Sequence, residues 1–273
     1  MSAGHGIVPR MADDDLEAAR ARRWWQTSRH LGRIDRAARF VDDVGFALLF
    51  PKKGVELPSL WEAASDRPLT DAVEAWNGSD IERVWRWKDE LPHRGLAWYG
   101  EFVRGRKSFL SPRLLADLYP RSGAADDFDE TALSPDARRI ARILLLDGPQ
   151  STAALREALD VQGSRGSERF SKAVGDLARA FVVTNFGTQD EGTGWPSAVL
   201  ELTMRVFTIP RRRDPDNSRL NAARTFLDTM VFAQPYHLGN AFHWGASAAR
   251  ETFEELVARG EADRDGPGYR LRA

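Results

Sequence analysis

Residues 134–208 constrain the fold of this chain more than any other stretch. Ser134 is a typical helix N-cap, it is followed by proline at the first helical position, and the apolar stripe of that helix ends before Gly148. A second helix follows "PQST" and stops near Gly163, and a third begins near Ser167. "FVVTNF", a Gly-rich turn and "SAVLELTM" then predict two strands of a β-hairpin. Three helices followed by a hairpin predict a winged helix-turn-helix domain.

The same plan recurs on both sides of this segment. In residues 218–273, two helical stretches flank a short Gly-bounded segment, and "EADRDGPGYRLR" predicts a turn between two strands. In residues 30–120 we expect a helix over 34–49, a short one near 58–65, a tryptophan-rich helix in "SDIERVWRWKDEL" and a hairpin in "GLAWYGEFVRGRKSFLS". The sequence therefore predicts a mainly α-helical chain with small β-hairpins (α+β), built from tandem winged helix-turn-helix domains.

Two stretches without apolar periodicity divide the chain into its predicted parts. The acidic "RSGAADDFDETA" and the "IPRRRDPDNS" stretch are typical of linkers. The predicted division is a tail and N-terminal helix (1–29), a winged-helix-like domain with the candidate site (30–120), a linker (121–133), a winged-helix domain (134–208), a linker (209–217) and a C-terminal winged-helix domain (218–273).

Composition excludes several classes of protein. No apolar run approaches the roughly 20 residues of a membrane helix and the N-terminus does not resemble a secretory signal, so we expect a cytoplasmic protein with no membrane partner. The chain has no cysteine, and its five histidines are scattered, so no metal site is expected. Phosphate-binding Gly-rich loops, nucleophile-elbow serines and metalloprotease helices are also missing, and we expect no cofactor.

Charge points to one part of the chain as a contact for nucleic acid. The net charge of −1 gives no overall attraction to DNA, so binding needs local clusters. Residues 134–213 carry 12 Lys+Arg against 9 Asp+Glu, a surplus that the flanking segments lack. The third helix of a DNA-binding winged helix enters the major groove. The candidate DNA contacts are Arg165, Arg169 and Lys172 on that helix, Arg104, Arg106 and Lys107 at the hairpin turn, and Arg211, Arg212 and Arg213, which either grip phosphates or tether domains.

Aromatic residues supply candidates for base stacking. Among the nine tryptophans, Trp85 fits an apolar helical stripe with Ile81, which leaves Trp87 as the candidate. Core packing is the more common role of such side chains.

An acidic pair interrupts the apolar stretch "AARFVDDVGFALLFP". Val41 and Val44 lie on one helical face, yet Asp42 and Asp43 stand between them. They form either a solvated face or a catalytic carboxylate pair, and the pattern alone leaves both possibilities open.

The order of elements, together with "HLGRIDRAARFVDDVGFALLF", "ELPHRGLAWYGEFVRGRKSFLSPRLLADLY" and "LVARGEADRDG", resembles the AlkZ/YcaQ family of bacterial DNA glycosylases over roughly residues 30–270. Members of that family excise alkylated purines and unhook interstrand crosslinks. Their Gln-apolar-Gln or Gln-apolar-Asp motif falls on Phe40-Val41-Asp42, so the acid matches and Phe40 replaces the glutamine. The resemblance implies that Asp42 positions the hydrolytic water, and Asp43 beside it is a second catalytic candidate. Phe40 is then a candidate surface for an extruded base.

Three functions are compatible with these features. A DNA glycosylase acting on damaged double-stranded DNA predicts weak sequence preference and strong salt dependence. A non-catalytic winged-helix regulator or scaffold that binds DNA predicts a preferred sequence. A protein-binding array predicts binding that survives high salt.

Overall fold

The computed structural model describes residues 13–28, 31–69, 80–161, 163–192, 194–210 and 214–272. Arg211, Arg212 and Arg213 lie outside the described residues. No helix in the described part of the chain is long and apolar enough to cross a membrane.

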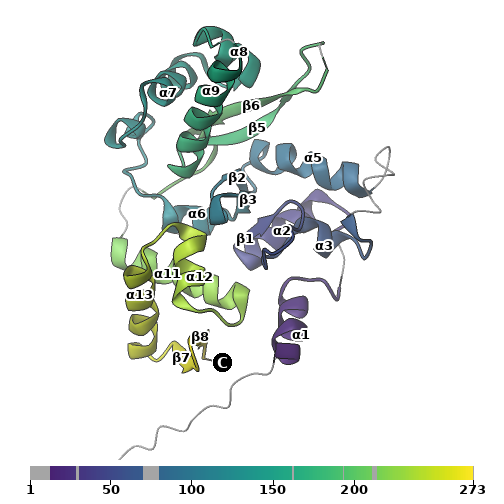
Figure 1. The fold of residues 1–273 in the computed structure, drawn as a ribbon, viewed down its shortest axis with the longest axis vertical. Helices are drawn as coiled ribbons and strands as arrows, with labels where there is room; N and C mark the ends of the chain where they lie inside the picture. The colour runs from purple at the N-terminus through teal and green to yellow at the C-terminus, as the bar shows by residue number, and fades with distance from the viewer. Residues whose placement is uncertain are drawn as a thin grey trace, which may run out of the picture.

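The first unit begins with a helix and ends in a hairpin (Figure 1). The strands form one antiparallel sheet in the order β1-β3-β2. Its elements are α2 (Ile34–Val44), β1 (Phe46–Leu48), α3 (Leu60–Ala64), α5 (Asp80–His93), β2 (Trp98–Glu101) and β3 (Lys107–Leu110).

The second unit repeats this order of helices and strands. Its strands pair in the corresponding order, β4-β6-β5. The third helix begins at Gly163, four residues before the position predicted from sequence. The elements are α7 (Pro135–Asp147), β4 (Gln150–Ser151), α8 (Thr152–Ala158), α9 (Gly163–Arg179), β5 (Val183–Gln189) and β6 (Ser197–Leu202).

The third unit has the same plan with its first strand reduced to one residue. Ala233 pairs with Tyr269 as an isolated antiparallel bridge at the position of that strand. The elements are α11 (Pro215–Met230), α12 (Pro235–Phe242), α13 (Ala246–Ala258), β7 (Ala262–Asp265) and β8 (Gly268–Leu271). The order helix, strand, helix, helix, hairpin therefore occurs three times. The prediction of a mainly α-helical chain with small β-hairpins is confirmed.

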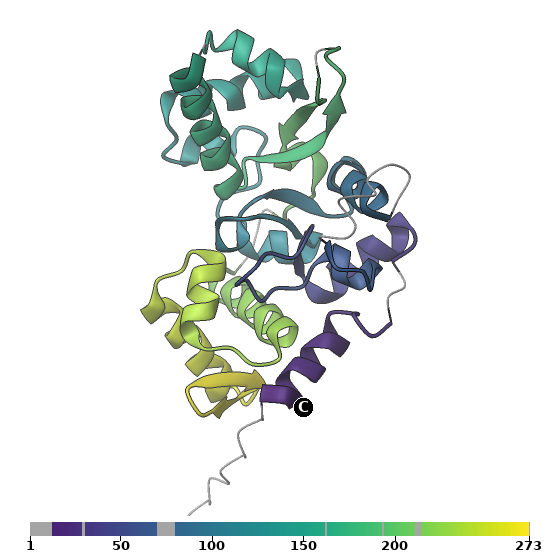
Figure 2. The same cartoon turned by 45° about the vertical axis from the view of Figure 1, so that its right-hand side comes forward.

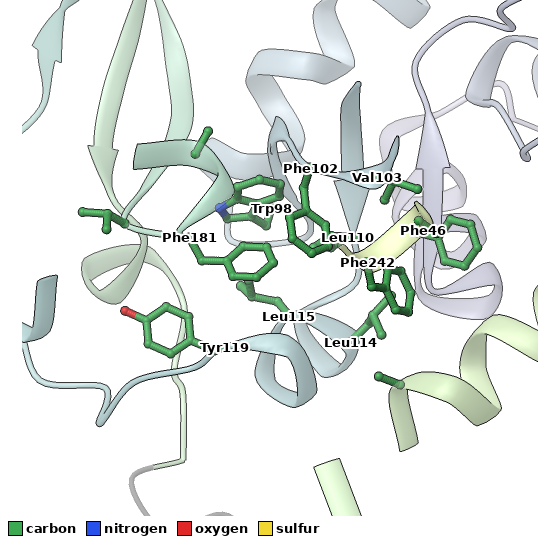
Figure 3. Close-up of a cluster of buried hydrophobic side chains, with 14 of the residues drawn as sticks. Phe46, Trp98, Phe102, Val103, Leu110, Leu114, Leu115, Tyr119, Phe181 and Phe242 are labelled. Atoms are coloured by element: carbon green, nitrogen blue, oxygen red, sulfur yellow. The ribbon is translucent and has the colours of Figure 1, made fainter. Parts of the chain in front are cut away.

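One hydrophobic core cluster runs through all three units, and a second cluster lies within the first unit. The first unit lies between the other two, and α1 (Asp13–Arg23) lies at the end of the molecule that holds the third unit (Figures 1 and 2). Phe46 of the first unit stacks on Phe226 of the third at 5.6 Å between ring centroids, and Trp98 meets Phe181 of the second at 5.3 Å. Figure 3 shows Trp98 and Phe181 beside Phe102, which links this cluster toward Phe242.

The first helix is shorter than the sequence predicts. We expected a helix over 34–49, but α2 ends at Val44 and residues 46–48 form β1. Gly45 has φ +75°, a left-handed conformation that stops the helix. β1 is buried along its whole length, so its residues give no alternation of polar and apolar side chains.

The stretch 121–133 is ordered and partly buried, although the sequence predicts a plain linker. Its 3₁₀ helix (Asp127–Glu130) places Phe128 in the core. Arg121 donates to Asp127 at 3.1 Å, and both side chains are almost inaccessible to solvent. The hydroxyl of Tyr119 also donates to Asp127. Arg121 also donates to the carbonyl of Ala180 at 2.5 Å, so this stretch connects the first unit to the second through a polar contact.

Candidate nucleic-acid interface

The outer face of α9 carries the three cations predicted for it. Phe170, Ala173 and Leu177 form its buried stripe, and Arg165, Arg169 and Lys172 are exposed. Arg169 also pairs with Asp136 at the start of α7, at 2.8 Å. Because Asp136 holds one orientation of that guanidinium, Arg165 and Lys172 are the more available charges on this face.

Charge separates α9 from the corresponding third helices of the other units. α9 carries four basic and two acidic side chains. In α5 four acids outnumber three Lys+Arg, and in α13 three glutamates outnumber one arginine. The second unit also covers part of α5, since Asn185 on β5 donates to the carbonyl of Lys88 at 2.8 Å and to Asp89 at 2.7 Å. Of these three helices, α9 is the one suited to a phosphate backbone.

The hairpin of the second unit presents an aromatic side chain that the sequence analysis did not single out. The β5–β6 hairpin reaches away from the helices of its unit (Figure 1), and Trp195 near its turn is 81% exposed. Exposed aromatic side chains at a wing can contact sugars or base edges. The available signal was a tryptophan within the Gly-rich turn between two predicted strands. Asp190 and Glu191 lie in the same turn and reduce its attraction for phosphate.

A groove beside α1, with a volume of about 800 Å³, lies between the first and third units. A second hollow of about 320 Å³ adjoins it and shares Arg20 and His237 with it. Lys52 and Lys53, on the loop after β1, line the larger hollow, and Arg104 lines the smaller. We call these two hollows together the α1 groove. It collects five basic side chains from four segments that are distant in sequence, together with three glutamates, Glu17, Glu56 and Glu62.

Arg20 and His237 are fixed within the α1 groove by hydrogen bonds. Arg20 donates to the carbonyls of Met230 and Phe232 and to Glu56 at 2.7 Å. The backbone N–H of Gln234 donates to Nδ1 of His237 at 3.0 Å, which leaves the proton of the neutral ring on Nε2. Burial, and then the nearby cations Arg20 and Arg104, lower the pKa of His237.

Glu62 is a carboxyl group that lines the α1 groove. It occupies the third position of α3, whose N-cap is Ser59. The backbone N–H of Glu62 donates to the Ser59 hydroxyl, which in turn donates to the Glu62 carboxylate at 2.6 Å. Burial raises the pKa of Glu62, and the hydrogen bond from Ser59 partly opposes that shift.

The acidic pair on α2 divides into one free and one engaged carboxylate. Asp43 accepts from Arg23 at 2.9 Å and from Nε1 of Trp25 at 2.7 Å. Arg23 pairs in addition with Asp228 at 2.6 Å. Asp42 is exposed, lines neither hollow of the α1 groove, and forms no hydrogen bond or ion pair with the residues that the structure describes. Asp43 thus holds the end of α1 against α2, and Arg23 extends this contact to α11.

The structure contradicts the predicted base-stacking role of both Phe40 and Trp87. Phe40 is fully buried, with Trp25 packed edge-on against it at 5.7 Å, so it offers no surface to a base. Trp87 is 2% exposed in the stripe of α5 with Ile81 and Val84, whereas Trp85 is half-buried at its edge. The sequence analysis placed Trp85 in the apolar stripe and Trp87 at the surface. The structure reverses these two positions, because α5 buries positions 81, 84, 87 and 91.

The cations predicted for the hairpin turn of the first unit lie on different surfaces of the structure. Arg104 and Arg106 are exposed, and Arg104 faces the α1 groove. Lys107 begins β3 and lines a different hollow, between the first and second units. Among the described residues no cluster of three His, Asp or Glu could hold a metal ion.

Comparison with known proteins assigns the family. The family model described as AlkZ related matches residues 31–234. The chain belongs to the AlkZ-related family. The resemblance inferred from the sequence is confirmed. No curated protein matches the chain in sequence.

A solved structure shares the fold of this AlkZ-related chain. The DNA glycosylase AlkZ of Streptomyces sahachiroi aligns with a TM-score of 0.53 and 14% sequence identity, over 96% of this chain and 70% of that one. At that identity the likeness concerns the fold.

Proposed function

We propose that this chain is a DNA-binding protein of the DNA-repair glycosylase kind. The second unit holds a damaged duplex, and the first unit carries the reaction. The observation that carries the proposal is the basic outer face of α9 in a member of the AlkZ-related family. Arg165 and Lys172 contact phosphates, and Trp195 contacts the sugar or base edges near the wing. The contacts to phosphate make affinity fall steeply with salt.

The reaction would break the bond between C1′ of the sugar and the nitrogen of an alkylated purine. The oxygen of a water molecule bonds to C1′, a carboxylate takes the proton of that water, and the purine leaves with the electron pair of the broken bond. The same carboxylate stabilises positive charge that develops on the sugar. The chemistry therefore needs a carboxylate beside the bound strand.

Two carboxylates are candidates for that role. The family motif favours Asp42, whose carboxylate is exposed and unpaired among the described residues. The surroundings favour Glu62, because it lines a groove with Lys52, Lys53 and Arg20 that can receive a phosphate backbone. A raised pKa also makes Glu62 the stronger base once it is ionised. We propose that one of these two residues activates the water.

An excision assay separates the two candidates. The substrate is a duplex with one alkylated purine, and the proteins are the natural chain, Asp42→Asn and Glu62→Gln. Each substitution keeps size and removes the carboxylate, and Gln preserves the hydrogen bond with Ser59. We expect one variant to lose abasic product at least 100-fold while it binds duplex normally. Full activity in both variants would contradict both assignments.

The buried Phe40 favours a second function. A chain without the motif glutamine suits a non-catalytic DNA-binding regulator or scaffold of the same fold. Selection of bound sequences from a random duplex library tests this function. A strong consensus sequence together with no excision product would support it, whereas sequence-independent binding would count against it.

A further inference from the structure

A hollow of about 280 Å³ lies where the first and second units meet, away from the α1 groove. Its apolar floor comes from the second unit: Val174 and Ala178 on α9, Val183 on β5 and Leu200 on β6. Trp85 and Tyr99 of the first unit supply aromatic walls. Trp85 is held in place because its ring stacks near Phe50 at 6.2 Å. The hollow is therefore a preformed apolar site between two units.

A cation lies at the edge of this apolar hollow. Lys107 lines it from an exposed position, and desolvation by the surrounding protein lowers the pKa of its ammonium group. The ammonium of Lys88 acts in the same direction, and Glu101 opposes it. An anion bound beside Lys107 would therefore be stabilised by its ammonium group.

The neighbouring acids are occupied by other partners. Lys88 pairs with Asp89 at 2.6 Å, and Glu101 pairs with Arg179 at 2.6 Å. Lys107 has no ion pair with any residue that the structure describes. Its ammonium group is therefore the available cation of the hollow.

We propose that this hollow binds a small planar aromatic carboxylate. The ring lies on the floor of Val174, Ala178 and Leu200, and the carboxylate pairs with Lys107. The apolar floor selects the aromatic body and the ammonium selects the negative charge. Because its lining comes from both units, the bound ligand fixes α9 relative to the first unit. This site is independent of the glycosylase proposal.

Isothermal titration calorimetry on the full chain tests the site with a matched pair of probes. The probes are 1-naphthoate and the neutral 1-naphthamide, which have the same ring system. We expect naphthoate to bind at least ten times more tightly than the amide. Lys107→Gln should remove that preference, and Lys53→Gln, in the α1 groove, should keep it.

A second variant checks the position of the ring. Ala198 lines the hollow, and Ala198→Phe fills it. That variant should lose binding of both probes while its circular dichroism spectrum matches that of the natural chain. The proposal is overturned if neither probe binds, if both bind equally, or if Lys107→Gln binds naphthoate as the natural chain does. Unchanged binding by a folded Ala198→Phe would also overturn it.

Discussion

At the scale of single residues, Arg23 fixes the carboxyl end of α2. Its guanidinium donates to the Asp43 carboxylate, to the Asp43 carbonyl at 2.6 Å and to Asp228. Removal of Arg23 leaves these acceptors without that donor, so we expect Arg23→Ala to lower the free energy of unfolding by about 1–3 kcal/mol. Urea unfolding measures the loss. Arg33→Ala is the control, because the Arg33 side chain is 82% exposed and pairs with Asp35 alone among described residues. Equal losses in the two variants would contradict the role of Arg23.

His237 makes stability depend on pH. Its pKa lies below the ordinary value of 6.5 in the folded chain, so the unfolded chain binds the proton more readily. Stability is therefore fully present above pH 6.5 and is lost as pH falls toward the lowered pKa. Urea unfolding at pH 7.0 and 5.5 should show a smaller loss for His237→Gln than for the natural chain. Glutamine keeps the acceptor for the N–H of Gln234. The same loss in both proteins would show that His237 does not titrate in this way.

The residues of the candidate site could be predicted from sequence only in part. Arg165, Arg169 and Lys172 follow from helical spacing, and the structure places them on one exposed face. The α1 groove joins residues near positions 20, 52, 62, 104 and 237, and no local pattern connects those positions. Glu62 was missed for that reason, although "SLWE" carries the Ser and Glu of a capping box.

At the scale of elements, Gly45 separates α2 from β1. A Cβ at this position would lie 2.3 Å from Cγ2 of Thr225, and the backbone has φ +75°. We expect Gly45→Ala to destabilise the chain by about 2–4 kcal/mol through strain and contact with α11. Gly105→Ala is the matched control, with φ +63° and no atom within 4 Å. It should cost about 1 kcal/mol. Thermal unfolding of the two variants compares them, and equal costs would contradict the close approach of α11.

Helices of the second and third units could be predicted from sequence because each has an apolar stripe and a clear end. Ser134 and Ser151 cap α7 and α8 as their positions suggest. β1 and β4 were missed for physical reasons. β1 is buried throughout, and β4 has two residues, too few to show any period.

At the scale of the whole molecule, the first unit uses its third helix and its hairpin to contact its neighbours. α5 meets β5 through Asn185, and Phe102 at the hairpin accepts a hydrogen bond from His243 at 2.8 Å. Under the proposed function, contact with DNA through a third helix therefore falls to α9 of the second unit. Such contacts between units depend on chain geometry that periodicity cannot reveal, so the sequence predicts the units better than their assembly.

This division of roles predicts the salt dependence of binding. The double variant Arg165→Ala and Lys172→Ala should bind duplex DNA more weakly and lower the slope of log affinity against log salt by about 2. Arg250→Ala, on the acidic helix α13, should leave affinity and slope unchanged. Fluorescence anisotropy at several salt concentrations gives both quantities. An unchanged slope in the double variant would exclude α9 as the contact.

Single-turnover excision by the natural chain tests the central claim most directly. The substrates are two duplexes of identical sequence, one with an alkylated purine and one undamaged, and the products are the released base and the abasic strand. The account predicts both products in equal amounts from the damaged duplex alone. No released base and no abasic strand from either duplex, under conditions where anisotropy shows that the protein is bound, would contradict glycosylase chemistry and leave a DNA-binding protein of the same fold.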